Sequence, residues 1–254
     1  MIFFIKKKLK NKFPINSVFV LGSTSTIAKE ICKELALKGC NEFFLLARDQ
    51  DKNNIFAKTL ETNFNVKAKT MVVDLNKNTE LNEELKKDIY SYDLYLLAAG
   101  YLGDSKLAKN NLEESQKIIN VNFYSLLPWL IEITSQKRIN SSGRLWVLSS
   151  VAGDKGKPSN YQYGAAKSAL TIFCEGILLR CVRKPFLVRI IKAGYVKSPM
   201  TKDLGSNLLC TNASYMAKKL LRNPNKRGIH YFPWWWKLIM LFIKLLPNSI
   251  IANL

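Results

Sequence analysis

The sequence is poor in the residues that build metal centres and disulfide frameworks. Its 254 residues include a single histidine, His230, and only five cysteines, none of them in a Cys-x-x-Cys pair. An odd number of cysteines does not suit a disulfide framework, so the thiols are predicted to be buried apolar groups of a reduced compartment. A histidine triad and a His-rich metal site are excluded, and no segment has metal-ligand spacing, so no metal is expected.

Acidic residues are also scarce, and their distribution is uneven. Against 39 Lys and Arg the chain has 19 Asp and Glu, which gives a net charge of +20. Residues 1–12 carry 5 basic and no acidic side chains, residues 13–179 carry 20 and 18, and residues 180–254 carry 14 and 1. A nucleic-acid binder would have the same overall charge. The apolar surroundings of the charges at both ends favour an anionic membrane surface as partner, and no nucleic acid.

No apolar run is long enough to span a membrane. The 13 residues between Pro233 and Pro247 would form a helix too short for a hydrocarbon core of ~30 Å at ~1.5 Å per residue. Lys237 and Lys244 are seven apart and share one face, and the residues 234–236 are tryptophans. This pattern predicts a helix lying in the membrane surface, where each basic residue contributes roughly 1 kcal/mol near anionic head groups. The alternative is an ordinary core or dimer-contact helix.

The N-terminal segment joins the same two features. Residues 1–5 are all apolar, and Lys6, Lys7 and Lys8 follow directly. The apolar part precedes the charges and is too short for a secretory signal. We therefore predict a basic, apolar N-terminal segment (residues 1–14), one catalytic domain (15–232) and a Trp-rich membrane-surface segment (233–254), in a cytoplasmic protein bound peripherally to the inner face of the membrane.

The remaining sequence alternates between strand and helix patterns. Such alternation, with apolar runs for strands buried on both faces, predicts a single α/β domain with a doubly wound parallel sheet and helices on both faces. Long helical patterns cover Leu112 to Lys137 and Tyr161 to Arg183. The strand candidates are Ser17 to Leu21, Glu42 to Ala47, Lys67 to Val73, Asp93 to Ala98, Gly143 to Ser150, Phe186 to Lys192 and Ile229 to Phe232.

One helical segment carries a tyrosine and a lysine at catalytic spacing. Tyr163 and Lys167 are four residues apart, which places them on one face of a helix, and Ser150 ends an apolar run thirteen residues upstream. A free phenol titrates near ~10, and a nearby ammonium favours its ionised form. These three groups can handle one carbonyl together. Tyr161 lacks this spacing to Lys167.

These residues, with several other segments, resemble the short-chain dehydrogenase/reductase family over nearly the whole chain. The resemblance implies a Rossmann-type fold and hydride transfer between a nicotinamide and a ketone or alcohol. It gives Tyr163 the role of proton donor, Ser150 that of hydrogen-bond donor to the carbonyl oxygen, and Lys167 that of ribose contact, while Asn122 rather than Asn120 would support a water relay. The segments that carry it are residues 18–28, 97–100, 120–123, 149–153, 161–170 and 193–200.

The same resemblance predicts a dinucleotide site. Gly22 keeps the tight turn after the first strand, whereas Thr26 and Ala28 replace the other two glycines of the family pattern. Hydroxyls beside a helix N-terminus favour phosphates. The predicted cofactor-binding residues are Gly22, Ser23, Thr24, Ser25, Thr26, Ile27, Arg48, Asp74, Leu75, Ala98, Ala99, Gly100, Tyr163, Lys167, Gly194, Val196 and Ser198.

The choice of cofactor depends on the end of the second strand. Arg48 can pair with the 2′-phosphate of NADP, and Lys52 lies one turn further. Asp49 is adjacent, and an acidic residue at this position would instead bind the ribose hydroxyls of NAD. NADP is favoured and NAD is the alternative.

Within the family, the chain is most similar to membrane-associated reductases of lipid-linked keto-sugars of the decaprenylphosphoryl-2-keto-erythro-pentose type. This similarity predicts a polyprenyl-phosphate keto-sugar in cell-envelope synthesis as substrate, a homo-oligomer (dimer or tetramer), and a partner oxidase. Polar residues between Ser198 and Ala213 favour a sugar phosphate. The alternatives are a reductase of a 3-ketoacyl, sphingoid or sterol ketone, and a catalytically silent dinucleotide-binding protein tethered to a membrane.

Overall fold

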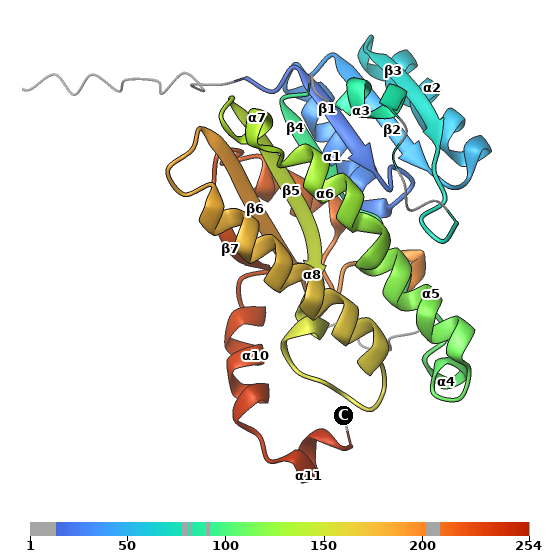
Figure 1. Cartoon of the computed structure of the whole chain (residues 1–254), viewed down its shortest axis with the longest axis vertical. Coiled ribbons are helices and arrows are strands. Elements are labelled where there is room, and N and C mark those ends of the chain that lie inside the picture. Colours follow the sequence, from blue (N-terminus) through green and yellow to red (C-terminus); the bar gives the residue numbers. More distant parts are fainter. Residues whose placement is uncertain (1–13, 78–80, 82, 90–91, 202–208, 254) are drawn as a thin grey trace, which may run out of the picture.

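A computed structural model describes residues 14–77, 81, 83–89, 92–201 and 209–253 as one sheet covered by helices (Figure 1). Seven parallel strands follow the order β3-β2-β1-β4-β5-β6-β7. The order reverses between β1 and β4, where open α/β sheets bind their ligands. The strands are β1 (Ser17–Leu21), β2 (Glu42–Ala47), β3 (Lys67–Val72), β4 (Leu94–Leu97), β5 (Gly143–Ser150), β6 (Phe186–Ala193) and β7 (Gly228–Phe232).

All seven strand predictions are confirmed to within one residue at either end. They succeed because central parallel strands are buried on both faces, so every residue must be apolar. All four residues of β4 are at most 1% exposed. Within β1, Phe19 packs into one core cluster with Tyr95 and Trp129, and Val20 packs into the other cluster with Ile31 and Trp146.

Helices cover both faces of the sheet, as the doubly wound prediction requires. One core cluster lies under α1, α2 and α9, and the other lies under α3, α5, α6 and α8. The helices are α1 (Thr26–Leu37), α2 (Gln50–Phe64), α3 (Glu83–Ile89), α4 (Ser105–Ala108), α5 (Leu112–Asn122), α6 (Leu127–Ile133), α7 (Gln136–Ile139), α8 (Tyr161–Arg180), α9 (Ala213–Leu220), α10 (Trp236–Leu245) and α11 (Asn248–Ile251). Short 3₁₀ turns are η1 (Tyr124–Leu126), η2 (Val151–Asp154) and η3 (Pro199–Thr201).

The prediction of one long helix from Leu112 to Lys137 is wrong. The chain leaves α-helical geometry at Phe123 (φ −145°, ψ −65°) and forms η1, α6 and α7. Pro128 lies in the first turn of α6, where its missing N–H costs nothing, whereas inside a continuous helix its ring would clash with the carbonyl four residues earlier. The break places Asn122 at the last position of α5.

The C-terminal segment forms α10, which extends below the sheet beside the loop after β5 (Figure 1). Within the described parts of the chain, no helix has the length and apolar character needed to cross a membrane. This agrees with the prediction that the run between Pro233 and Pro247 does not span. The predicted N-terminal membrane segment lies outside the described residues, except for Pro14.

Candidate active site

The path from β5 to α8 brings Ser150 to the tyrosine and the lysine. Ser150 is the last residue of β5, and its Oγ accepts a hydrogen bond of 3.1 Å from the Ala152 amide in η2. Two glycines let η2 lie directly on α8: a Cβ at Gly153 would lie 2.7 Å from the Ser168 nitrogen, and one at Gly164 would lie 2.8 Å from the Ala152 oxygen. This close approach needs glycine at both positions, and it fixes the serine loop against the first turns of α8.

Tyr163 and Lys167 lie on one face of α8, as predicted. The Lys167 Nζ lies 5.8 Å from the centre of the Tyr163 ring. Burial raises the pKa of Tyr163 to about 12, although a hydrogen bond with Ser150 acts to lower it. The structure thus differs from the expected lowering of the phenol pKa, because desolvation outweighs the other effects. A phenol with this pKa is protonated at neutral pH and can donate a proton.

Lys167 is held deep in the protein. It is 3% exposed, and its Nζ donates to the Leu148 carbonyl at 3.3 Å. Burial lowers its pKa to about 8. Ser149 and Thr171 brace the same turn of α8, since their hydroxyls are 2.7 Å apart and both contact the Lys167 carbonyl. The ammonium is therefore fixed in position and close to its titration point at physiological pH.

Asn122 is fully buried at the end of α5. Its Nδ2 donates to the carbonyls of Tyr101 (2.6 Å) and Ile118 (2.8 Å), and its Oδ1 accepts from the Tyr101 amide (3.2 Å). The side chain thus fixes the loop after β4. Asn120 does not take this place, and the water relay assigned to Asn122 stays a prediction.

The predicted dinucleotide residues gather at the carboxyl ends of β1 and β4. Gly22 has φ +87°, and a Cβ there would lie 2.4 Å from the Ala99 nitrogen, so this turn accepts only glycine. Helix α1 begins at Thr26, and its N-cap residue Ser25 makes no side-chain cap hydrogen bond. The amides of the first turn are therefore available to an anion. This cradle and open helix end suit a dinucleotide pyrophosphate.

The four hydroxyls predicted beside this helix differ in their surroundings. Ser23 is fully buried, and its hydroxyl donates to Asn53 Oδ1 (2.6 Å) and Leu46 O (3.2 Å). It therefore links the turn to β2 and α2. Thr24, Ser25, Thr26 and Ile27 are half-buried at the surface of the turn.

The two candidates at the end of β2 have different environments. Arg48 is exposed. Asp49 is the N-cap of α2: it accepts hydrogen bonds from the Lys52 amide (3.0 Å) and from Lys52 Nζ (2.6 Å), and these bonds lower its pKa. Its carboxylate is thus engaged by its own helix. The ion pair is exposed, so it contributes little to stability.

The remaining predicted cofactor residues lie in the loops after β3, β4 and β6. Asp74 accepts a hydrogen bond from the Asn76 amide (2.9 Å) in a turn after β3, so it caps a turn and not a helix. Leu75 and Ala98 are buried, Ala99 is half-buried and Gly100 is exposed. Val196 is buried and pairs with Thr211, while the Ser198 amide donates to Thr201 Oγ1 (3.1 Å). The substrate-loop residues Lys202, Asp203, Ser206 and Asn207 lie outside the described residues.

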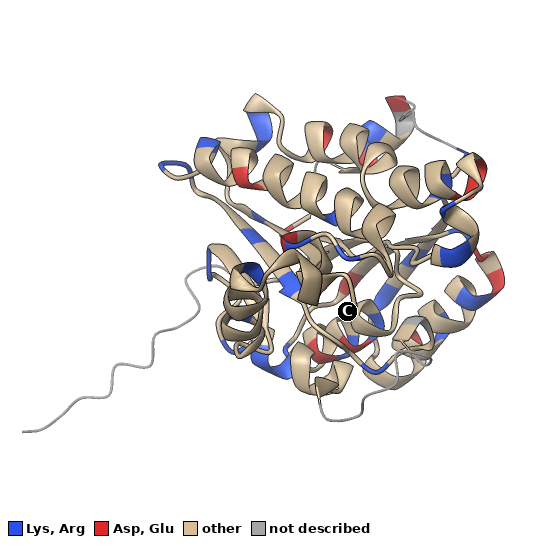
Figure 2. Cartoon of the chain, turned by 90° about the horizontal axis from the view of Figure 1, so that it is seen from below, with Lys and Arg blue, Asp and Glu red and all other residues tan. Residues whose placement is uncertain are grey.

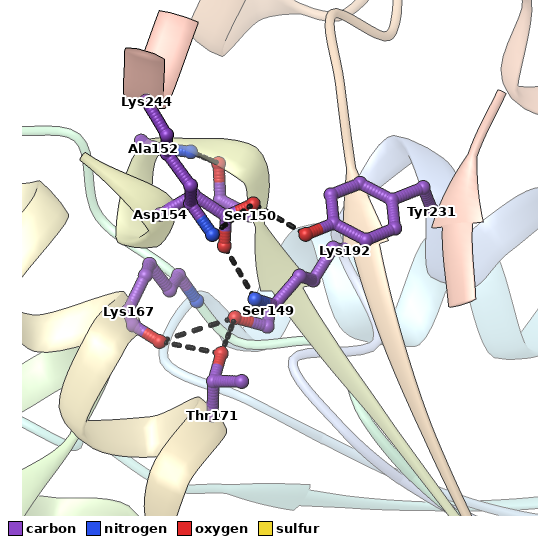
Figure 3. A network of polar contacts seen from close by, with 9 residues as sticks. All are labelled: Ser149, Ser150, Ala152, Asp154, Lys167, Thr171, Lys192, Tyr231 and Lys244. Carbon is purple, nitrogen blue, oxygen red and sulfur yellow. Dashed lines mark hydrogen bonds and ion pairs between the residues drawn. The ribbon is translucent and has the colours of Figure 1, made fainter. Parts of the chain in front are cut away.

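A buried carboxylate beside the serine loop was not predicted from the sequence. The side chain of Asp154, the last residue of η2, is 1% exposed and forms ion pairs with Lys192 of β6 and, at 3.8 Å, with Lys244 of α10. It also accepts a hydrogen bond of 2.5 Å from the Tyr231 hydroxyl of β7. Figure 3 shows these three side chains converging on Asp154 next to Ser150. The network joins the serine loop to β6, β7 and α10.

Helix α10 also packs against the site through its apolar inner face. Trp236 is 4% exposed, clusters with Val151 and Met240, and lies so close over Gly194 that a Cβ there would be 2.0 Å from its Nε1. The prediction that all three tryptophans belong to an interfacial surface is therefore wrong for Trp236. Trp235 is half-buried, and Trp234 is 69% exposed. Lys244, which was predicted to share a face with Lys237, forms an ion pair with Asp154.

Most of the cysteines lie in the protein core. Cys32, Cys40, Cys174 and Cys181 are buried free thiols, and Cys210 is half-buried. Burial raises the pKa of Cys174 to about 12. No group of three or more His, Cys, Asp or Glu within these parts of the chain could hold a metal ion.

Comparison with known proteins identifies the family of the chain. A short chain dehydrogenase family model matches residues 16–209. An uncharacterized oxidoreductase of Mycobacterium tuberculosis is 23% identical over 85% of this chain and 89% of its own length, and a 3-oxoacyl-[acyl-carrier-protein] reductase of Buchnera aphidicola is 24% identical over 85% of each. In structure, a short-chain dehydrogenase from Sphingobium yanoikuyae in complex with NADPH has a TM-score of 0.77 at 15% identity, covering 92% of this chain and 98% of its own. The chain is therefore an oxidoreductase of the short-chain dehydrogenase family.

Proposed function

We propose that this protein is an NADPH-dependent carbonyl reductase whose ketone substrate is carried on a lipid at a membrane surface. The observation that carries the proposal is the position of α10. Its inner face packs on the loop of Ser150, and its outer face exposes a stripe of large apolar side chains. A lipid-bound ketone at that outer face is close to the reacting groups.

The chemistry follows from three side chains. A reduced nicotinamide, when bound, would supply the hydride to the carbonyl carbon. Tyr163, protonated at neutral pH, donates its phenolic proton to the carbonyl oxygen, so that C=O becomes CH–OH. Ser150 donates its hydroxyl proton in a hydrogen bond to the same oxygen, and Lys167, held at the Leu148 carbonyl, stabilises the phenolate left on Tyr163.

The cofactor is assigned from the end of β2. Because the Asp49 carboxylate is bound by the amide and the ammonium of Lys52, it is a poor acceptor for ribose hydroxyls. The neighbouring Arg48 guanidinium is exposed and can form a charge-assisted hydrogen bond with a 2′-phosphate. Gly22 and the first turn of α1 would hold the pyrophosphate. NADP is therefore preferred over NAD, and the NADPH complex of a structural neighbour agrees with this choice.

The membrane location is assigned from the outer face of α10, which we define as Trp234, Leu238, Leu241, Phe242 and Leu245. These side chains are between 57% and 77% exposed. A spacing of three, one and three residues places the last four on one side of the helix, and Trp234 lies in the turn just before it. Large apolar side chains in such a stripe are expensive to leave in water and are typical of helices that lie in the membrane interface.

Among lipid ketones, a polyprenyl-phosphate keto-sugar agrees best with the polar residues of the loop before α9. Thr201, Thr211 and Asn212 belong to it. A second candidate is a 3-ketoacyl thioester or another lipid ketone. It is favoured by the 24% identity to a 3-oxoacyl-[acyl-carrier-protein] reductase.

The test is NADPH oxidation by the purified full-length protein. Substrates would be a polyprenyl-phosphate 2-keto-sugar, the same sugar after mild acid release from its lipid, and a 3-ketoacyl thioester, with Tyr163→Phe as control. We expect turnover of the lipid-linked sugar that Tyr163→Phe abolishes. Turnover of the thioester alone would replace the sugar by the second candidate, and equal turnover of the released sugar would remove the role of the lipid.

A further inference from the structure

A basic groove runs along the edge strand β7, beside the start of α10. It has a volume of about 660 Å³ and is open to solvent. β7 is the last strand of the sheet and pairs only with β6, so this edge is not covered by another described strand. We call it the β7 groove, and its lining includes Arg189, Lys192, Lys219, Lys226, Trp234 and Lys237.

Most of the positive charge that lines the β7 groove has no acidic partner among the described residues. Five Lys and Arg side chains line it, whereas no Asp or Glu of the described residues does. One of the five, Lys192, is neutralised by Asp154. Lys219, Lys226 and Lys237 form no ion pair within the described parts of the chain. Figure 2 shows Lys and Arg segments around α10, at the left of that view, with few acidic segments among them.

Arg189 places a further, buried positive charge beneath the groove. It is 5% exposed, and its guanidinium lies 5.0 Å over the Trp146 ring. Its Nη1 donates to the carbonyls of Leu220 (3.0 Å) and Asn223 (3.3 Å), but its buried Nε has no hydrogen-bond partner. Buried guanidinium groups are ordinarily paired with an anion, because desolvation of an unpaired charge is costly. No carboxylate of the described residues pairs with it, so the positive potential of the groove is left for a ligand.

The groove is also continuous with apolar surface. Lys219 Nζ lies 5.3 Å from the centre of the Tyr215 ring. The Tyr215 ring in turn packs beside the Phe232 ring, with 6.0 Å between the two ring centres. Trp234 lines the groove and is the first residue of the outer face of α10. A ligand that fills the groove with an anionic group can therefore place an attached apolar chain along α10.

From this charge and this continuity, we propose that the β7 groove binds the phosphate group of an anionic lipid, with Lys219, Lys226 and Lys237 as direct contacts. The inference rests on the proposed membrane location and adds a specific headgroup site to it. Phosphate esters match a cluster of cations without carboxylates, since several ammonium groups can share their oxygens. The site is distinct from the dinucleotide cradle at Gly22, which follows β1, four strands away from β7 in the sheet order.

The test uses vesicles of neutral lipid that contain either phosphatidic acid or oleic acid, matched in surface potential, with binding of the full chain measured by flotation. The groove variant is Lys219→Gln/Lys226→Gln/Lys237→Gln. A matched control removes three exposed lysines far from α10, as Lys58→Gln/Lys67→Gln/Lys109→Gln. At roughly 1 kcal/mol per basic residue, the groove variant should bind phosphatidic acid vesicles about a hundredfold more weakly. The control should change binding less than threefold.

The pattern of results separates this inference from the proposed function. Wild type should prefer phosphatidic acid over oleic acid, and the groove variant should lose that preference while turnover of a water-soluble ketone is unchanged. Equal loss in both triple variants would overturn the groove, leaving membrane association in place. A wild type that binds no vesicle would overturn the membrane location itself. Tight binding of inorganic phosphate alone in calorimetry would overturn the lipid as ligand and show that the groove takes a soluble phosphate. Conversion of a dimer to a monomer by the groove variant would also overturn it, because a second copy of the chain would then occupy the groove.

Discussion

Removing the Asp154 carboxylate should destabilise the protein and disturb its active site together. In Asp154→Asn, Lys192 keeps its charge but loses its partner, although only 11% of its side chain is exposed. Breaking a buried ion pair from one side costs about 3–5 kcal/mol. Lys244 is 45% exposed at 3.8 Å, and such a pair contributes only about 0–1 kcal/mol. Asn can still accept the Tyr231 hydrogen bond, so we expect a loss of about 3 kcal/mol.

The expected loss can be measured by urea denaturation and by thermal unfolding. For a chain of this size, each kcal/mol lowers Tm by about 2–4 °C, so Tm should fall by about 6–12 °C. Lys244→Gln is the control and should cost less than about 1 kcal/mol. The double variant Asp154→Asn/Lys192→Gln should recover more than half of the lost stability, because the unpaired charge is removed.

Activity gives a second readout of the same change. Asp154 ends the turn that Ser150 begins, so its loss should lower kcat/KM about tenfold at temperatures where the variant is fully folded, which corresponds to about 1.4 kcal/mol. KM for the dinucleotide should change little, because Asp154 is not among the predicted cofactor-binding residues. A single variant that loses under about 1 kcal/mol of stability and keeps wild-type kcat/KM would refute the assignment of Asp154 as the group that holds the serine loop.

Three further predictions concern the site itself. Tyr163→Phe should lower kcat at least a thousandfold but leave NADPH affinity within about threefold, measured by fluorescence titration, because only the transferable proton is removed. Arg48→Ala should raise KM for NADPH about tenfold to a hundredfold, because a charge-assisted hydrogen bond to the 2′-phosphate contributes roughly 1.5–3 kcal/mol. KM for NADH should stay nearly unchanged; equal effects on both would remove the basis for NADP. Because the pKa of Lys167 is lowered to about 8, kcat/KM for reduction should fall as pH rises through 8. Between pH 8 and 10.5 the unfolded chain keeps the proton that folded Lys167 has released, so its contribution to stability should rise with pH.

The strands and the catalytic spacing could be predicted because both depend on short-range patterns. A strand buried on both faces must be apolar at every position, as Leu94 to Leu97 is. Tyr163 and Lys167 share a face because of helix periodicity alone. The break at Phe123 was missed because the apolar pattern continues across it, although Pro128 was a usable signal.

The rest of the site depends on contacts between distant segments. Asp154, Lys192, Tyr231 and Lys244 come from four elements, and nothing local distinguishes Asp154 from a surface aspartate. The run of three tryptophans has no visible period, so the sequence could not show that Trp236 turns inward over Gly194 while Trp234 turns outward. A glycine opposite a tryptophan is recognisable only once both are placed.

The two faces of α10 connect the proposed lipid site to the reacting groups. Tyr231 lines the β7 groove and also bonds Asp154, which ends the turn begun at Ser150. A helix with its side chains is about 10 Å across, so an apolar chain on the outer face is about one helix diameter from Val151 on the inner face. A ketone that reaches Ser150 while its phosphate stays in the groove must therefore be joined to that phosphate over roughly this distance. A keto-sugar joined to a lipid phosphate carries both groups in one molecule, whereas a sterol ketone, which has no phosphate, would leave the groove empty.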